Sequence, residues 1–213
     1  IVRTEPAVKP PAEPEPPAVE EATAERVVTY IGEVYKTYIL AELGGSLFFI
    51  DKHAAHERIL YNELKSAARQ EAQQLLLPVS VPLSKEEYTV ITNELEALSQ
   101  AGFEVEDFGG STVLVRGIPM MLSDCDVAAA IQEIAGGLVS GRREIAMDKL
   151  DWIYHSTACR AAVKGGDHSS PEELAVMARR VLLQDDIRYC PHGRPVCFEL
   201  TRKELEKQFG RIV

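Results

Sequence analysis

The residues of this sequence best suited to chemistry lie in the stretch FFIDKHAAHERILYNEL, residues 48–64. A run of apolar residues ends at Asp51, and His53 and Glu57 follow within six positions. Residues four apart share one face of a helix, so this imidazole and carboxylate could bind one cation together. Alternatively, Asp51 only caps the helix, and His53 and Glu57 are solvated surface residues. This stretch alone leaves both interpretations open.

A second group of possible ligands lies near the other end of the chain. In the stretch YCPHGRPV, Cys190 and His192 flank a proline within a turn rich in Gly and Pro. A thiolate and an imidazole form a donor pair that zinc prefers. Cys159, in the stretch ACRAA, lies on a predicted helix and could be either a ligand or a core residue. We interpret Cys125 and Cys197 as structural.

The stretch QQLLLP could bind a partner protein. It fits the pattern Q-x-x-L-x-P through Gln73, Leu76 and Pro78. A short extended peptide of this kind can insert its apolar residue into a hydrophobic pocket of another protein. Three consecutive leucines are also typical of a buried core, so the pattern by itself does not decide between these interpretations.

The candidate ligands require a strand that passes directly into a helix. From Val27 the sequence is rich in β-branched and aromatic residues, and SLFFID forms a second strand after the Gly44–Gly45 turn. The helix that starts near His53 places Ile59, Leu60 and Leu64 on one apolar face and continues through KSAARQEA.

A second segment, residues 79–143, shows the order strand, helix, two strands, helix. Ser84 and Glu87 form a predicted capping box at the start of one long helix, and two strands flank the Gly109–Gly110 turn. Further helices are predicted around ACRAA and from two more capping boxes, Ser170–Glu173 and Thr201–Glu204.

The predicted fold class is therefore α+β. We expect one lobe from residues 26–78 and 144–213, with a small α/β lobe inserted at residues 79–143. Residues 1–25 are rich in Pro and Glu and read as a disordered linker to an upstream domain. Because the first residue is Ile, we expect the chain to be part of a longer protein.

Composition narrows the possible functions of this 213-residue chain. The net charge of −10 argues against a dedicated DNA-binding domain, because nonspecific DNA affinity comes mainly from neutralising phosphates. Four cysteines are too few for a secreted disulfide scaffold of this length, so we expect reduced thiols in the cytoplasm. No apolar run approaches the ~18 residues of a membrane span, and no Gly-rich phosphate loop is visible.

Together these motifs resemble the C-terminal domain of bacterial mismatch-repair proteins of the MutL family that carry a latent endonuclease. The family motif D-Q-H-A-x-x-E-x-x-x-x-E is similar to DKHAAHERILYN here. The motifs A-C-[RK], C-P-H-G-R-P and F-x-R match ACR, CPHGRP and FGR, and QQLLLP matches the clamp-binding motif. The resemblance covers the chain from about residue 27. Lys52 replaces the usual Gln, and Asn62 replaces the last Glu of the long motif.

The resemblance implies one composite metal site. It would assign nicking of duplex DNA to Asp51, His53 and Glu57, with Asp51 the residue that nicking cannot spare. It gives the zinc-type ligands as Glu57, Cys159, Cys190 and His192, with His53 close by, and clamp binding to Gln73, Leu76 and Pro78. The implied cofactors are a tightly held Zn²⁺ and a weaker catalytic Mn²⁺ or Mg²⁺, with ATP used only by an N-terminal domain.

The resemblance also implies partners and a location. These are a second copy of the chain, the sliding β-clamp, MutS and, weakly, duplex DNA, in the bacterial cytoplasm and at the nucleoid during repair; no membrane is expected. One alternative is a non-catalytic, zinc-stabilised dimerisation and clamp-docking module, which Asn62 favours. Another is a thiol hydrolase that uses Cys190 or Cys159, although no orienting third group is visible.

Overall fold

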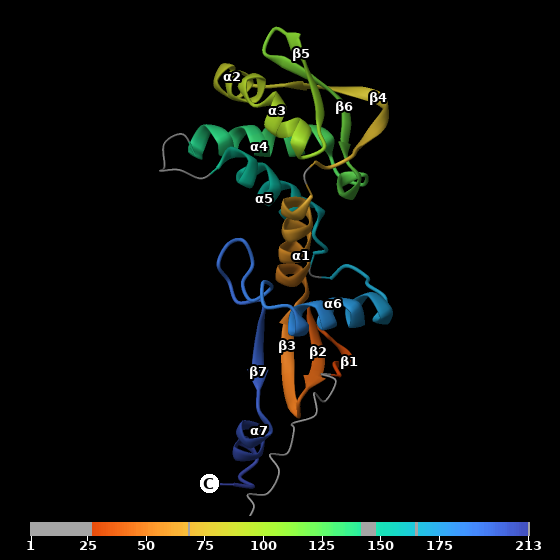
Figure 1. Ribbon diagram of the computed structural model, residues 1–213, viewed down its shortest axis with the longest axis vertical. Coiled ribbons are helices and arrows are strands. Elements are labelled where there is room, and N and C mark those ends of the chain that lie inside the picture. Colours follow the sequence, from red (N-terminus) through yellow and green to blue (C-terminus); the bar gives the residue numbers. More distant parts are fainter. Residues whose placement is uncertain (1–26, 68, 142–147, 165, 213) are drawn as a thin grey trace, which may run out of the picture.

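The computed structural model describes residues 27–67, 69–141, 148–164 and 166–212. The expected linker at residues 1–25 and the expected lobe boundary near residue 143 lie outside these residues. The described part is elongated, with one antiparallel sheet towards each end and helix α1 (Lys52–Ser66) between them (Figure 1). It contains seven α-helices and two antiparallel sheets, which confirms the α+β fold class.

The first sheet has the strand order β1-β2-β3-β7 and holds the N-terminus of α1. Its strands are β1 (Thr29–Val34), β2 (Tyr38–Leu43), β3 (Ser46–Asp51) and β7 (Cys197–Leu200). Ile39, Ala41 and Ile50 are fully buried on the face that packs with helix α6 (Pro171–Leu183). On the other face Leu40, Phe49 and Phe198 lie in register, and Phe198 is 59% exposed. The alternation gives this sheet one buried and one open face.

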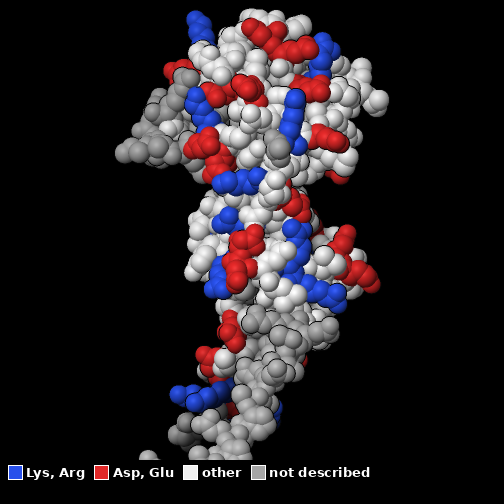
Figure 2. Space-filling model, viewed as in Figure 1, with Lys and Arg blue, Asp and Glu red and all other residues white. Residues whose placement is uncertain are grey.

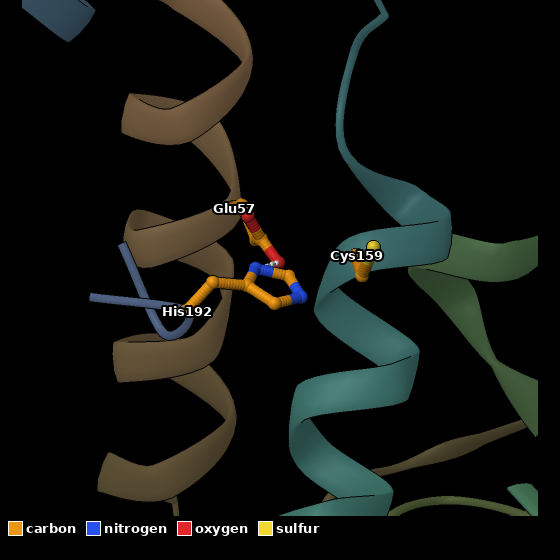
Figure 3. A group of neighbouring side chains, drawn as sticks. All are labelled: Glu57, Cys159 and His192. Atoms are coloured by element: carbon orange, nitrogen blue, oxygen red, sulfur yellow. Dashed lines mark ion pairs between the residues drawn. The ribbon is translucent and has the colours of Figure 1, made fainter. Parts of the chain in front are cut away.

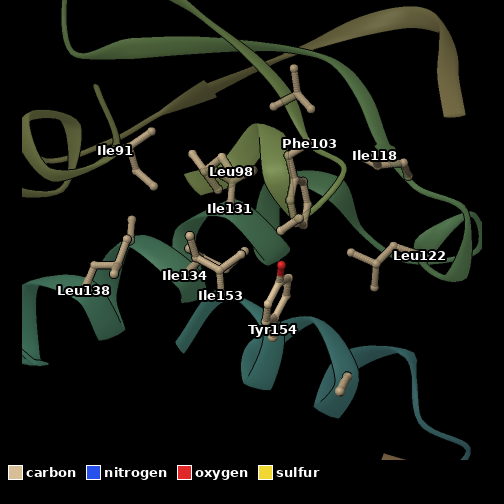
Figure 4. Packing of buried hydrophobic residues seen from close by; sticks show 14 of the residues in the cluster. Ile91, Leu98, Phe103, Ile118, Leu122, Ile131, Ile134, Leu138, Ile153 and Tyr154 are labelled. Atoms are coloured by element: carbon tan, nitrogen blue, oxygen red, sulfur yellow. The ribbon is translucent and has the colours of Figure 1, made fainter. Parts of the chain in front are cut away.

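The second sheet has the strand order β4-β6-β5. Its strands are β4 (Ala72–Pro82), β5 (Glu104–Gly109) and β6 (Thr112–Pro119), and a short 3₁₀ helix, η1 (Met120–Leu122), follows β6. Helices α2 (Lys85–Asn93), α3 (Leu95–Gln100), α4 (Val127–Gly141) and α5 (Lys149–Ala161) complete this end of the molecule. Their apolar side chains form the larger core, in which Ile131, Ile134 and Ile153 are almost wholly buried (Figure 4).

Helix α1 belongs to both cores because its two ends bury different residues. Ala55 and Ile59 lie in the core under the first sheet, whereas Leu60 and Leu64 lie in the larger core. Helix α5 packs beside the C-terminal half of α1, and Asp151 accepts hydrogen bonds there from Tyr61 (2.7 Å) and Lys65 (2.8 Å). The α1–α5 pair thus joins the two ends of the molecule.

Several predicted elements are found, and three boundaries were wrong. All three capping boxes, at Ser84, Ser170 and Thr201, are present. The residues before Gly44 form two strands rather than one, α1 ends at Ser66 rather than near residue 72, and the helix after Ser84 is interrupted at Glu94. The predicted division into lobes stays a prediction. Strand β4, which begins at Ala72, pairs with β6 in the second sheet.

The last helix, α7 (Arg202–Gln208), follows β7 and lies at the far end of the first sheet (Figure 1). In the described part of the chain, no helix combines the length and apolar character that a membrane crossing requires.

Candidate metal centre

Three predicted ligands from three separate elements meet in space. Glu57 lies on α1, Cys159 on α5 and His192 in the loop before β7, and their side chains converge (Figure 3). One ligand atom from each lies within 4.8 Å of those of the other two. A carboxylate, a thiol and an imidazole at this spacing are suitable donors for one zinc ion. The packing of α1 against α5 is what brings residues 57 and 159 together.

Glu57 is the feature of this group most in need of a ligand. Its side chain is 2% exposed, and its Oε1 atom lies 3.2 Å from Nδ1 of His192. The two atoms are not in hydrogen-bond geometry, and Oε1 has no hydrogen-bond partner within the described residues. A buried carboxylate oxygen without a donor is costly, so this atom fits a site that a cation would complete.

Cys159 is a thiol, not a thiolate, when no metal is bound. Burial first, and then the negative charges of Glu57 and Glu133, raise the pKa of Cys159 to about 11. A cysteine nucleophile needs the opposite, a lowered pKa. These surroundings therefore count against a thiol hydrolase that uses Cys159. A metal ion would replace the proton, since zinc binds the deprotonated sulfur.

His155 is a neighbour of this group that the sequence analysis missed. It is 8% exposed, its Nδ1 has no partner among the described residues, and its ring meets the His192 ring edge-on with centroids 4.4 Å apart. The Trp152 ring stacks on the His155 ring, with centroids 5.5 Å apart. Burial, and next the neighbouring His192, lower the pKa of His155. The signal was its spacing of four from Cys159, which places both on one face of α5.

The other predicted residues lie close by but outside this group of three. Asp51 ends β3 and caps α1, accepting a hydrogen bond from the amide of Ala54 at 3.0 Å. His53 lies one turn before Glu57 and hydrogen-bonds the carbonyl of Val163 through Nδ1 at 2.8 Å. This hydrogen bond fixes the ring and leaves Nε2 free, as is common for histidines that bind metals.

Cys190 lies in the core beneath the first sheet and is 2% exposed. The turn that carries it is tight, with the amide of Gly193 bonded to the carbonyl of Cys190 at 2.8 Å. Arg58 on α1 donates to the carbonyls of Tyr189 and Cys190, which attaches this loop to the helix that carries Glu57. The roles of Asp51, His53 and Cys190 as ligands stay predictions.

The two departures from the family motif have structural explanations. Lys52 is fully buried, and its Nζ donates to Glu33 at 2.7 Å and to the carbonyl of Asp167 at 2.8 Å, so its charge is matched by a carboxylate. Asn62 donates to Asp186 at 2.8 Å, in the segment before the CPHGRP turn. Both side chains bind neighbouring segments of this chain.

The predicted clamp-binding residues lie on an edge strand. Strand β4 pairs with β6 on both sides of an irregular stretch between Gln74 and Val79. Leu76 and Leu77 are 101% and 80% exposed. Gln73 and Pro78 are also exposed. Large exposed leucines on a sheet edge are typical of a protein-binding site, and they exclude the alternative that Leu76 is a core residue.

Two antiparallel sheets are joined by α1, and candidate metal-ligand atoms gather where α1 meets α5. The class is therefore an α+β domain with a candidate metal site, and comparison with known proteins gives its family. Residues 31–169 match the family described as the MutL C terminal dimerisation domain, and the chain belongs to this family.

The chain is also similar to curated proteins named DNA mismatch repair protein MutL. That of Heliobacterium modesticaldum is 38% identical over 95% of this chain and 32% of its own length. Those of Geotalea daltonii and Geobacter sulfurreducens are each 37% identical, over 86% and 85% of this chain and 31% of their own lengths. The chain thus spans about a third of the length of these relatives.

Proposed function

We propose that this chain is the homodimerisation and DNA-nicking domain of a MutL-type mismatch-repair protein, dependent on metal ions and stimulated by a sliding clamp. The observation that carries the proposal is the buried Glu57 oxygen, without a hydrogen-bond partner, beside Cys159 and His192. Its setting in a MutL-family domain supports phosphodiester hydrolysis as the proposed reaction class.

Each group of residues has a proposed role in this reaction. Zn²⁺ and Mn²⁺ or Mg²⁺, when bound, would supply an activated water and stabilise charge on the phosphate oxygens. Glu57, Cys159, Cys190 and His192 would hold the zinc, and Asp51 and His53 would position the reacting groups. Asp51 is well placed because its second carboxylate oxygen is not needed for the helix cap.

DNA binding by the domain itself is proposed to be weak. Figure 2 shows acidic and basic side chains intermixed over the face drawn, without a continuous basic surface among the described residues. With a net charge of −10, the chain would depend on the clamp, on MutS and on an ATP-using N-terminal domain to reach DNA at the nucleoid in the cytoplasm. Tight binding of duplex DNA at physiological salt would contradict this.

Clamp binding is proposed at Gln73, Leu76 and Pro78. Leu76 projects fully into solvent from a stretch of β4 where the pairing with β6 is irregular, so the peptide can enter a pocket without breaking the sheet. The homodimer is proposed to form through the open face of the first sheet, where Phe49 and Phe198 stack with ring centroids 4.8 Å apart.

The test is nicking of supercoiled plasmid in Mn²⁺, with and without clamp, by the wild-type chain, Asp51→Asn and the exposed control Asp124→Asn. We expect Asp51→Asn to lose at least about 100-fold in rate, the control to stay near wild type, and chelation to abolish nicking until Mn²⁺ is restored. Clamp should increase the wild-type rate, and Leu76→Ala should remove that increase.

A second candidate is a non-catalytic dimerisation and clamp-docking module stabilised by zinc. Asn62 favours it, since it binds Asp186 where the family motif has a glutamate. Zinc binding and a stable dimer without nicking by the wild-type chain would establish this second function instead.

A further inference from the structure

The backbone of Val163 lies between two histidines of α1. Nδ1 of His53 is 2.8 Å from the carbonyl oxygen of Val163, and the amide nitrogen of Val163 is 3.0 Å from Nδ1 of His56. Both hydrogen bonds link residues more than one hundred positions apart in the sequence. One peptide segment is therefore held on both its donor and its acceptor side by neighbouring imidazoles.

The two hydrogen bonds determine the tautomer of each ring. A carbonyl can only accept, so Nδ1 of His53 must carry a proton; in the neutral ring Nε2 then carries the lone pair. An amide N–H can only donate, so Nδ1 of His56 must be unprotonated and the proton lies on Nε2. The two histidines thus have opposite tautomers, fixed by the same residue.

The segment that these histidines hold begins near a proposed ligand. Val163 follows Ala162, the C-cap of α5, and lies four residues after Cys159. Further along the segment, the buried Lys52 donates to the carbonyl of Asp167. The first turns of α1 therefore set the path of the chain as it leaves the helix that carries Cys159.

We propose that His56 is a positioning residue of the metal centre. By accepting the Val163 amide, it holds the Val163 carbonyl where His53 must donate from Nδ1, so that Nε2 of His53 is kept free to bind a metal. The inference rests on the proposed metal-dependent function and adds to it a residue outside the predicted ligand set. Partners of this kind commonly contribute 10–100-fold to metal affinity.

The test compares the metal-free wild-type chain with His56→Leu and His56→Asn by long-range ¹H–¹⁵N correlation of ¹⁵N-labelled histidines. The Asn side chain keeps an acceptor at the position of Nδ1, whereas Leu removes it. We expect His53 in the wild type to be the Nδ1–H tautomer and His56 the Nε2–H tautomer. His53 should become a mixture of tautomers in His56→Leu and stay unchanged in His56→Asn.

Zinc affinity, measured by competition with a chromophoric chelator, is the second readout. We expect a loss of about 10–100-fold in His56→Leu and much less in His56→Asn, with both variants still dimeric. An unchanged His53 tautomer in His56→Leu would overturn the proposal, as would a wild-type protein in which His53 is the Nε2–H tautomer. The histidine tautomers are measured in the metal-free protein. A wild-type chain with the expected tautomers but no zinc affinity would refute the proposed function and leave the link between the histidines intact.

Discussion

At the scale of single residues, Lys52 places a fully buried charge next to His53, a predicted ligand of the candidate metal centre. Its side chain is fully buried, whereas its partner Glu33 keeps 20% of its surface exposed. Loss of either partner therefore has unequal consequences. A lysine without a counter-charge would remain in the interior, but a glutamate without its lysine would still reach water.

Glu33→Gln should accordingly destabilise the fold more than Lys52→Met. We expect about 3–5 kcal/mol for Glu33→Gln, less for Lys52→Met, and partial recovery in the double variant, because breaking a buried pair costs more than replacing it. Urea denaturation of the three variants would measure this. Equal losses in the two single variants would show that burial of Lys52 does not dominate.

The thiol of Cys159 allows a test of the charges around the proposed site. With its pKa raised to about 11, only about one molecule in a thousand carries the thiolate at pH 8, so alkylation by iodoacetamide should be slow and should accelerate as the pH rises towards 11. Glu57→Gln removes a negative charge that opposes the thiolate, so the pKa should fall and the rate at pH 8 should rise severalfold. Burial remains, so the pKa should stay above its ordinary value.

Alkylation at Cys159 can be followed separately by mass spectrometry of peptides, with the exposed Glu172→Gln on α6 as a control. An unchanged rate in Glu57→Gln would mean that Glu57 does not act on the thiol.

Sequence patterns identified the candidate metal ligands better than they identified ion-pair partners such as that of Lys52. The resemblance to the family motifs pointed to Glu57, Cys159 and His192, which the structure brings together. The partner of Lys52 could not be found in the same way, because Glu33 lies on a strand 19 residues earlier and meets Lys52 only after the sheet forms. Contacts between distant segments leave no local periodicity to read.

At the scale of elements, the starts of helices and the turns at Gly44–Gly45 and Gly109–Gly110 were predictable, but the turn between β1 and β2 was not. Each capping box depends on two side chains three residues apart, so Ser84, Ser170 and Thr201 could be identified from the sequence as helix N-caps. The turn between β1 and β2 uses Tyr35 and Lys36 with positive φ angles of 54° and 50°. Non-glycine residues seldom adopt this conformation, and no Gly or Pro marked the turn.

Two adjacent glycines of α4 give a matched test of helix packing beside the candidate metal centre. A Cβ at Gly137 would come 1.9 Å from the Trp152 ring, whereas a Cβ at Gly136 would find only Glu87 Oε1, at 3.9 Å. We expect Gly137→Ala to destabilise by about 1–3 kcal/mol through overpacking, and Gly136→Ala to stabilise by about 0.5–1 kcal/mol through helix propensity.

Trp152 also stacks on His155, so displacement of Trp152 in Gly137→Ala should weaken zinc binding, measured with the same chelator competition. If Gly137→Ala equalled Gly136→Ala in stability and in zinc affinity, α4 and α5 would be free to move apart at this point.

At the scale of the whole molecule, the two sheets differ in what their exposed surfaces offer. The open face of the first sheet carries Leu40, Phe49 and Phe198 in one cross-strand row. The second sheet exposes the leucines of β4 on its edge. The face of the first sheet suits contact with a second copy of the chain. The short segment of β4 suits insertion into a pocket of a partner protein.

Two exposed aromatic residues, one on each sheet, form a matched pair for locating the dimer interface. Phe198 on β7 is 59% exposed and Phe108 on β5 is 66% exposed. In a two-fold dimer each substitution acts twice, and an aromatic residue at the centre of an interface commonly contributes 2 kcal/mol or more. Phe198→Asp should therefore weaken dimerisation by at least about 100-fold, and Phe108→Asp should have little effect.

Sedimentation equilibrium would measure the dimer dissociation constant of both variants, and circular dichroism would verify that each is folded. Because the row formed by Leu40, Phe49 and Phe198 is on the face opposite the core, Phe198→Asp should lose the partner without losing the fold. A folded Phe198→Asp protein that stays dimeric would move the interface away from this sheet. A monomeric Phe108→Asp protein would place it on the second sheet instead.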